Sequence, residues 1–297
     1  MNYFIDTEFL EGTQKESFPV SLFRKNTPPT IDLISIGIVA EDGREYYAIS
    51  KDFNLKEAWN RYQMKQVYGD VRNAFPKEVK EYWIRENVLK HIYRELYFKT
   101  NDVSYSQAAF LYKGIQEGKH DDLFTYEMLK HLINHYGKTN KQIANEIVEF
   151  VYGESSNLDG LSPLQEAQKY EPNNHIPIPK FYGYFADYDW VAFCWLFGKM
   201  IELPKGFPKY CIDLKQILDE KITSLNWMFG RDIWSNSNRS IKTIGKGEFQ
   251  EKDRPATFEE KLSVFKELVE YPKQENAHNA LSDAKWNKKL YEFLNKM

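Results

Sequence analysis

Residues 3–9 have the pattern of an apolar strand, yet they carry two carboxylates, Asp6 and Glu8. Residues two positions apart in a strand point to the same face, so these side chains would bring their oxygens into one small volume. Two like charges at that distance raise each other's pKa unless a cation lies between them. The spacing therefore indicates a site for a hard divalent cation such as magnesium, which prefers oxygen ligands. The alternative is a strand end with two solvated acids.

A second pair of candidate residues, His278 and Asp283, lies near the other end of the sequence. It precedes residues 286–294, which have the pattern of a helix. Asn279 suits the N-cap of that helix and would place Asp283 near its first turn, where the helix dipole favours a carboxylate. His278 would then lie just outside the helix, free to turn over the site. A pair of surface residues is the alternative interpretation.

A third acid is expected where a predicted strand meets a predicted helix. Residues 180–185 are aromatic and indicate a buried strand, and residues 190–197 are apolar on every side and indicate a buried helix. Asp187 and Asp189 lie at the junction between them. We expect one of the two to face the same cleft as the other acids. Capping of the helix is the alternative role for either aspartate.

The order of these residues resembles that of the DEDDh 3′→5′ exonucleases. The strings FIDTEF and HNALSDA carry the resemblance, together with the pair Tyr188 and Asp189, in which an aromatic residue precedes the acid. This pattern favours Asp189 over Asp187 as the third acid. More narrowly, the chain resembles the small ribonuclease-T-like 3′→5′ exoribonucleases through the strings YFIDTEFLEG, IDLISIGIVAEDGREYYAIS and YFADYDWVAFCWLFG. These strings cover a minority of the chain.

The resemblance implies a phosphodiesterase that uses two divalent cations, Mg²⁺ or Mn²⁺. Asp6, Glu8, Asp189 and Asp283 would hold the two cations, with Asp6 as the bridging ligand. His278 would act as the general base on the attacking water, a role that suits a side chain that titrates near neutral pH. An all-carboxylate site lacks the nitrogen and sulfur ligands that zinc and copper prefer.

Three residues next to the first acids are candidates for contact with nucleic acid. In the resembling exonucleases the residues after Asp-x-Glu touch the terminal base, which implies this role for Phe9 and Leu10; plain packing is the alternative. Thr7 points to the opposite face of a regular strand, but its backbone N–H could reach the scissile nucleotide. Aromatic residues make up 16% of the chain, and although most must lie in the core, base stacking on such rings commonly holds single strands.

Composition limits the partners and the compartment. A formal net charge of −3 over 297 residues argues against a strongly basic protein that coats long nucleic acid. It is compatible with an enzyme that grips a few terminal nucleotides. The sequence has no apolar run of transmembrane length and no signal-peptide pattern. Cys194 and Cys211 provide no disulfide framework, so we expect a cytoplasmic protein without membrane association.

The pattern of strands and helices predicts an α/β fold. Residues 2–9 and 33–40 indicate strands, and Asp42 and Gly43 form a turn that leads into a third strand at 45–49. Helices follow, and strand and helix then alternate. We therefore expect a mixed sheet flanked by helices, which fits the ribonuclease-H-like arrangement that the resemblance implies.

The middle of the sequence is helical in character, with apolar residues three to four positions apart. Predicted helices span residues 58–71, 77–97, 105–117, 123–136 and 141–152. Since these exceed what the fold needs, we interpret residues 1–297 as a single exonuclease domain with a large inserted helical lobe at about 55–135. A second insertion spans about 224–276.

The resemblance thus implies an exoribonuclease that acts on the 3′ end of single-stranded RNA or on 3′ overhangs and releases nucleoside 5′-monophosphates. The preference for RNA rests on the resemblance alone. A DNA 3′→5′ exonuclease of the proofreading or repair type is an alternative, as is a hydrolase of short oligonucleotides. A non-catalytic nucleic-acid-binding module of the same fold is another, although such a module would be expected to lose one of the acids or the histidine. Related exonucleases often pair as homodimers, so the resemblance also allows a homodimer.

Overall fold

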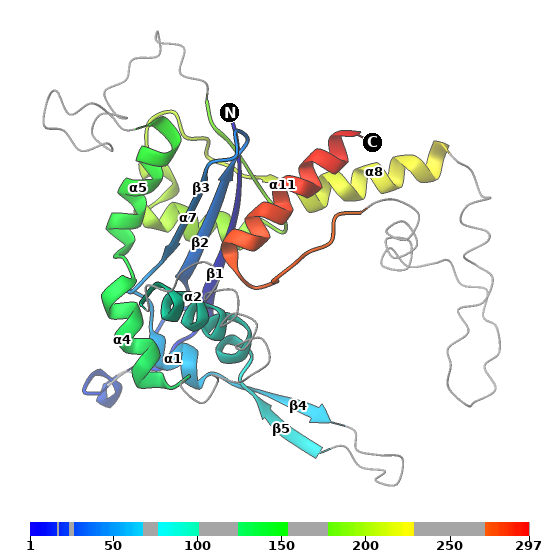
Figure 1. Cartoon of the computed structure of the whole chain (residues 1–297). Helices are drawn as coiled ribbons and strands as arrows, with labels where there is room; N and C mark the ends of the chain where they lie inside the picture. The colour runs from blue at the N-terminus through cyan, green and yellow to red at the C-terminus, as the bar shows by residue number, and fades with distance from the viewer. Residues whose placement is uncertain are drawn as a thin grey trace, which may run out of the picture.

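A mixed sheet of five strands forms the centre of the molecule, in the order β3-β2-β1-β6-β7 (Figure 1). β1 (Asn2–Gly12) runs antiparallel to β2 (Thr30–Ala40), which runs antiparallel to β3 (Glu45–Ile49). On its other side β1 runs parallel to β6 (Lys180–Gly183), which pairs in parallel with β7 (Ile212–Asp213). The computed structural model describes residues 1–16, 18–23, 27–67, 77–100, 124–153, 178–228 and 271–296.

The strand that carries the first two acids, β1, has a neighbour on each side and lies in the middle of the sheet. Its residues alternate between the two faces, so that Phe4 and Ile5 belong to different hydrophobic cores. Asp6 and Glu8 continue the face of Phe4, whereas Thr7 continues the face of Ile5. A register shift against β2 directly after Glu8 ends this regular alternation.

Helices cover both faces of the sheet (Figure 1). α5 (Asn140–Tyr152) and α7 (Asp187–Leu196) contribute to the core on the face of Ile5. α8 (Leu214–Met228) and α11 (Ala280–Lys296) contribute to the core on the opposite face. α7 and α11 therefore begin on opposite sides of β1. The predicted mixed sheet flanked by helices is the architecture observed.

A third hydrophobic core joins the sheet to the helices that lie between β3 and α5 in the sequence. α1 (Leu55–Asn60), α2 (Lys90–Thr100) and α4 (Tyr126–Tyr136) surround it, and Leu10 of β1 contributes to it. The described residues also include three short helical segments: η1 (Val20–Leu22), η2 (Arg85–Leu89) and η4 (Met200–Glu202).

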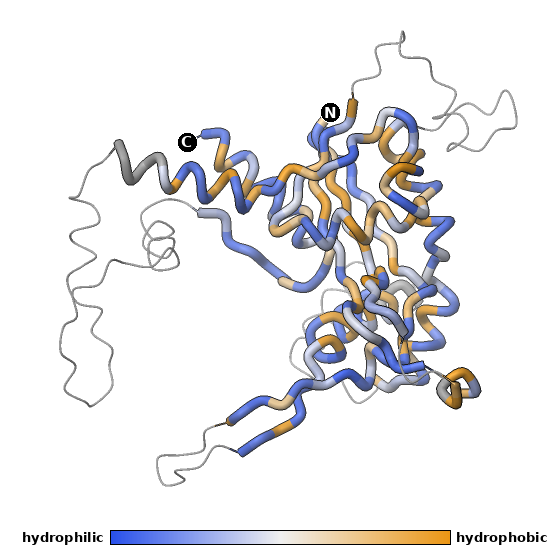
Figure 2. The backbone as a smooth tube through the Cα atoms, turned by 180° about the vertical axis from the view of Figure 1, so that it is seen from behind, coloured by the Kyte–Doolittle hydropathy of each residue, from blue (hydrophilic) through white to orange (hydrophobic). Residues whose placement is uncertain are grey.

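The predicted helices at 58–71 and 77–97 are wrong in part. α1 ends at Asn60, and β4 (Gln63–Val67) and β5 (Lys77–Glu81) form an antiparallel hairpin that projects from the helices (Figure 1). The hairpin is mainly hydrophilic, with a few hydrophobic positions (Figure 2). The backbone groups of each strand form hydrogen bonds with those of the other strand. The spacing of apolar residues within one segment does not reveal that such a partner exists. The described residues between β3 and α5 are therefore not wholly helical.

Other predictions are confirmed, with shifted boundaries. Gly43 adopts a φ of +94° in the turn between β2 and β3, as the predicted hairpin requires. The last helix, α11, begins at Ala280 rather than at residue 286. The predicted helix at 105–117 and most of the second insertion at 224–276 lie outside the described residues. None of the helices that the structure describes is long and apolar enough to cross a membrane.

Candidate active site

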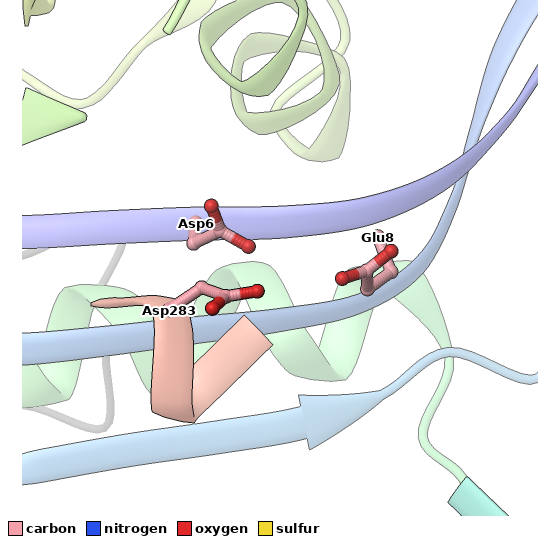
Figure 3. Close-up of side chains that lie close together, drawn as sticks. All are labelled: Asp6, Glu8 and Asp283. Carbon is pink, nitrogen blue, oxygen red and sulfur yellow. The ribbon is translucent and has the colours of Figure 1, made fainter. Parts of the chain in front are cut away.

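Three of the predicted acids come together although they are far apart in the sequence. Asp6 and Glu8 project from β1, and Asp283 projects from the first turn of α11 (Figure 3). One carboxylate oxygen of each lies within 4.8 Å of the others. Asp283 is buried, whereas Asp6 and Glu8 are half-buried. The cluster can therefore be reached from solvent.

Gly37 of β2 allows the last helix to lie directly on the sheet. It pairs with Asp6, and a Cβ added at Gly37 would lie 2.3 Å from the carbonyl oxygen of Ala280, at the start of α11. Further along the helix, the buried Asn287 donates from Nδ2 to the carbonyl oxygen of Ile5 at 2.8 Å. These contacts fix the first turn of α11 beside the acids of β1. The sequence offered only a glycine inside a predicted strand as a signal for this close approach.

Both carboxylate oxygens of Asp283 accept hydrogen bonds. The Gln274 side chain donates from Nε2 to Oδ1 at 2.6 Å, and the backbone N–H of His278 donates to Oδ2 at 2.8 Å. Asn279 caps α11 as predicted, because its Oδ1 accepts from the backbone N–H of Ser282 at 3.0 Å. The cap and these two donors orient the Asp283 carboxylate. Sequence analysis did not identify Gln274, which lies before the helix.

Asp189, in the first turn of α7, contacts β1 at Thr7. Its Oδ1 accepts hydrogen bonds from the backbone N–H of Thr7 at 2.9 Å and from the Thr7 hydroxyl at 2.5 Å. Thr7 points away from Asp6 and Glu8, as the strand alternation predicts, and its N–H binds Asp189 in this structure. Asp189 is buried and Asp187 is exposed, although both lie in the first turn of α7. Asp189 does not belong to the group of three acids within 4.8 Å.

Burial raises the pKa of each of these acids. For Asp6 burial is the largest cause, and the charges of Asp189, Glu8 and Asp283 raise the pKa further. Burial and then the charges of Asp283 and Asp189 raise the pKa of Glu8 to about 8. Burial raises the pKa of Asp189 to about 6, while the hydrogen bonds from Thr7 oppose the shift. A divalent cation would remove the repulsion that opposes ionisation.

His278 contacts both the acid cluster, through Asp283, and the segment that follows the β4–β5 hairpin, through Trp83. Its backbone has a φ of +68°, a left-handed conformation that is uncommon for a residue other than glycine. Its imidazole packs edge to face against the indole of Trp83, with 4.7 Å between ring centroids. The charge of His278 lowers the pKa of Asp283, although burial of this carboxyl still raises that pKa on balance. Trp83, which sequence analysis did not identify, follows the β4–β5 hairpin.

The two predicted base contacts have different environments. Phe9 is half-buried, and its ring meets the exposed ring of Tyr188 edge to face at 5.8 Å. Leu10 is fully buried and belongs to the third core, which corresponds to the packing alternative for this residue. Of the pair, only Phe9 therefore keeps surface that is accessible to solvent.

The donor set of the acid cluster fits a hard divalent cation. All of its ligand atoms are carboxylate oxygens, which Mg²⁺ and Mn²⁺ prefer. Within the part of the chain that the structure describes, no lysine or arginine forms an ion pair with these acids or with Asp189. Carboxylates that are partly or fully buried and have no lysine or arginine partner would be stabilised by a bound metal ion.

Comparison with known proteins reveals distant relatives of this chain. Two proteins of Mycobacterium tuberculosis, from two strains and both named 3′-5′ exoribonuclease, are 24% identical to it over 221 residues. The match covers 74% of this chain and 76% of each relative. No protein-family model matches the chain. The chain therefore has a distant relationship to exoribonucleases.

Proposed function

We propose that this protein is a two-metal-dependent 3′→5′ exoribonuclease that removes nucleoside 5′-monophosphates from the 3′ end of single-stranded RNA. The meeting of Asp6, Glu8 and Asp283 within 4.8 Å is the observation that carries the proposal. Grouped acids of this kind suit phosphodiester hydrolysis, and the relatives' names support both RNA as the substrate and the 3′→5′ direction.

Asp6, Glu8, Asp283 and Asp189 would hold the two cations. When bound, such cations supply positive charge for the attacking and leaving oxygens of the phosphodiester. Gln274 keeps the Asp283 carboxylate oriented through its hydrogen bond to Oδ1. Thr7 similarly fixes Oδ1 of Asp189 and leaves Oδ2 as the oxygen available for a ligand.

His278 would take the proton from the attacking water. It lies just outside the first turn of α11, and its backbone N–H donates to Asp283, which keeps the residue beside the acid cluster. The proton would pass from the water to a ring nitrogen while the water oxygen attacks phosphorus. Loss of this histidine should lower kcat far more than it changes KM, because a general base acts in the chemical step.

We propose that the fold belongs to the ribonuclease-H-like class. The strand order β3-β2-β1-β6-β7 supports this proposal. β1 antiparallel to β2 and parallel to β6 gives a mixed sheet with the acids on its central strand. Within this proposal, residues at about 55–135 and 224–276 are insertions into a single exonuclease domain. A fold class alone does not establish an activity, so the assignment rests on the acids and the relatives.

The test is degradation of 5′-labelled single-stranded RNA and DNA of equal sequence with magnesium, with manganese or with chelator. We expect a ladder that shortens from the 3′ end on RNA and disappears with chelator. A ladder on DNA alone would favour the alternative of a DNA exonuclease. Cleavage that persists in chelator would contradict the metal mechanism.

Matched variants at the start of α7 test the choice of the third acid. Asp189→Asn should lower kcat by a factor of at least about 10³, because a metal ligand is lost. Asp187→Asn changes an exposed acid two residues away and should leave kcat unchanged. The reverse result would show that Asp187 is the functional acid.

A further inference from the structure

Aromatic rings and cationic side chains gather where the β4–β5 hairpin joins the rest of the chain. We call this the hairpin-root surface; it consists of Tyr62, Lys80, Tyr82, Trp83 and Arg85. Lys80 Nζ lies 4.2 Å from the ring centroid of Tyr62, and the Arg85 guanidinium lies 4.0 Å from that of Tyr82. The rings of Tyr62 and Tyr82 are 5.9 Å apart, so the two cation–ring pairs are continuous.

The aromatic rings of the hairpin-root surface are not buried in a hydrophobic core. Tyr62 is 44% exposed and Trp83 is 38% exposed. All five residues of β4 are exposed, and neither β4 nor β5 contributes to the three hydrophobic cores. A two-stranded hairpin is only marginally stable alone in water, so exposed aromatic residues at its root suggest a ligand that covers them.

Trp83 connects the hairpin-root surface to the candidate active site. Its indole packs against the imidazole of His278, with 4.7 Å between centroids, while part of its surface stays exposed. His278 in turn binds Asp283 through its backbone N–H. A strand that leaves the acids on this side would meet Trp83 first and the Tyr62 and Tyr82 pair next.

The charge at the hairpin root has the sign that phosphates require. Residues 62–67 and 77–85 contain four cationic side chains and two anionic ones, which gives 4 − 2 = +2, in a chain whose net charge is −3. Within the described part of the chain, Lys80 lies over an aromatic ring and has no ion-pair partner. Arg85 keeps a contact with the partly exposed Glu86 at 3.1 Å. Cationic side chains interleaved with partly exposed aromatic rings are the composition that binds single-stranded nucleic acid.

We propose that the hairpin-root surface binds the single-stranded RNA that lies upstream of the 3′-terminal nucleotide. Bases would stack on Trp83 and Tyr62, and Lys80 and Arg85 would contact the backbone phosphates. The proposal rests on the proposed exonuclease function, because the 3′ end must occupy the acids for the upstream strand to reach Trp83. It assigns the hairpin to substrate affinity for longer strands, not to the chemical step.

The first experiment compares substrate lengths. The variant Tyr62→Ala with Lys80→Ala removes one ring and one cation that lie away from the acids. We expect kcat/KM to fall about tenfold on a twenty-nucleotide RNA, which is what loss of one modest stacking contact gives. On a dinucleotide, which is too short to extend to the hairpin, kcat/KM should equal that of the wild type. The matched control is Lys209→Ala with Tyr210→Ala, an exposed pair of the same residue types before β7.

Two results would overturn the proposal: unchanged kcat/KM on the long RNA, or an equal loss on the dinucleotide. Equal thermal unfolding temperatures of the wild type and the variants would show that the fold is intact.

Fluorescence anisotropy with the same labelled long RNA in chelator tests binding without cleavage. The wild type should bind this RNA about tenfold more tightly than the hairpin variant. If it does so but does not cleave the RNA when metal is present, the proposed exonuclease function is refuted and the proposed binding site is retained. Equal binding by both would refute the binding site.

Discussion

Magnesium binding should release protons from the acid cluster. Burial raises the pKa of Glu8 to about 8, and the charges of Asp283 and Asp189 contribute. The pKa of Asp6 is raised well above its usual value, mainly by burial. At pH 7 a carboxyl with a pKa of 8 is about 90% protonated, and only the deprotonated form binds a metal ion. Metal binding must therefore displace about one proton from Glu8 and a further share from Asp6.

This release makes the affinity for the metal depend on pH. For each proton displaced, the apparent dissociation constant should fall about tenfold per pH unit between pH 6 and pH 8. One to two protons thus predict a tightening of about 10²- to 10⁴-fold across that interval. The dependence should flatten above the pKa of Glu8. Solvent that reaches the half-buried Glu8 would lower its pKa, and the tightening of the apparent dissociation constant would then lie closer to about 10²-fold.

Isothermal titration calorimetry measures both quantities. Titration of the metal-free protein with Mg²⁺ at pH 7, in two buffers of different ionisation enthalpy, gives the number of protons released. Glu8→Gln should release about one proton fewer than the wild type, whereas Asp187→Asn at the exposed neighbouring acid should not change the number. Metal binding that is equally tight at pH 6 and pH 8, without proton release, would refute the reasoning.

Three further predictions concern the frame of the site and its titration. Gly37→Ala should lower the free energy of unfolding by about 1–3 kcal/mol in urea titrations and should reduce kcat, because the new Cβ would lie 2.3 Å from the Ala280 carbonyl oxygen and displace α11; an unchanged unfolding midpoint would contradict the close packing. Thr7→Val removes a hydroxyl that lowers the pKa of Asp189, so the acid limb of the pH profile of kcat/KM should move to higher pH; an unmoved limb would separate Asp189 from the reaction. In the folded metal-free protein the pKa of Glu8 lies above its usual value of 4.5, so the folded state retains a proton that the unfolded chain has lost. This contribution to the free energy of unfolding is fully present below pH 4.5 and is lost as the pH rises to about 8, and its size is on the order of a few kcal/mol. Urea unfolding midpoints, measured in chelator across this pH range, would detect the loss. Glu8→Gln should abolish it.

The sequence identified the local parts of the site well. Two acids in alternation on a strand, and an aspartate four residues after an N-cap asparagine, are patterns that neighbouring residues enforce by themselves. The structure confirms that Asn279 caps α11 and that Asp283 lies in its first turn. The assignment of these acids, and of Asp189, His278, Thr7 and Phe9, to catalysis or binding stays a prediction.

The parts that sequence analysis missed depend on contacts between distant segments. Residues 63–67 and 77–81 pair with each other, and their helical spacing gave no sign of that partner. Gly37 permits the approach of α11, and Trp83 meets His278 from a segment almost 200 positions earlier in the sequence. Such roles belong to pairs of residues, and a single sequence records each member separately.

The distance along the chain between residue 6 and residue 283 has a consequence for protein synthesis. Asp6 and Glu8 are translated long before α11, which supplies the third acid. Docking of α11 on β1 closes a very long loop, so it belongs to the late steps of folding. The cluster would thus stay incomplete while the emerging protein is still close to the messenger that encodes it.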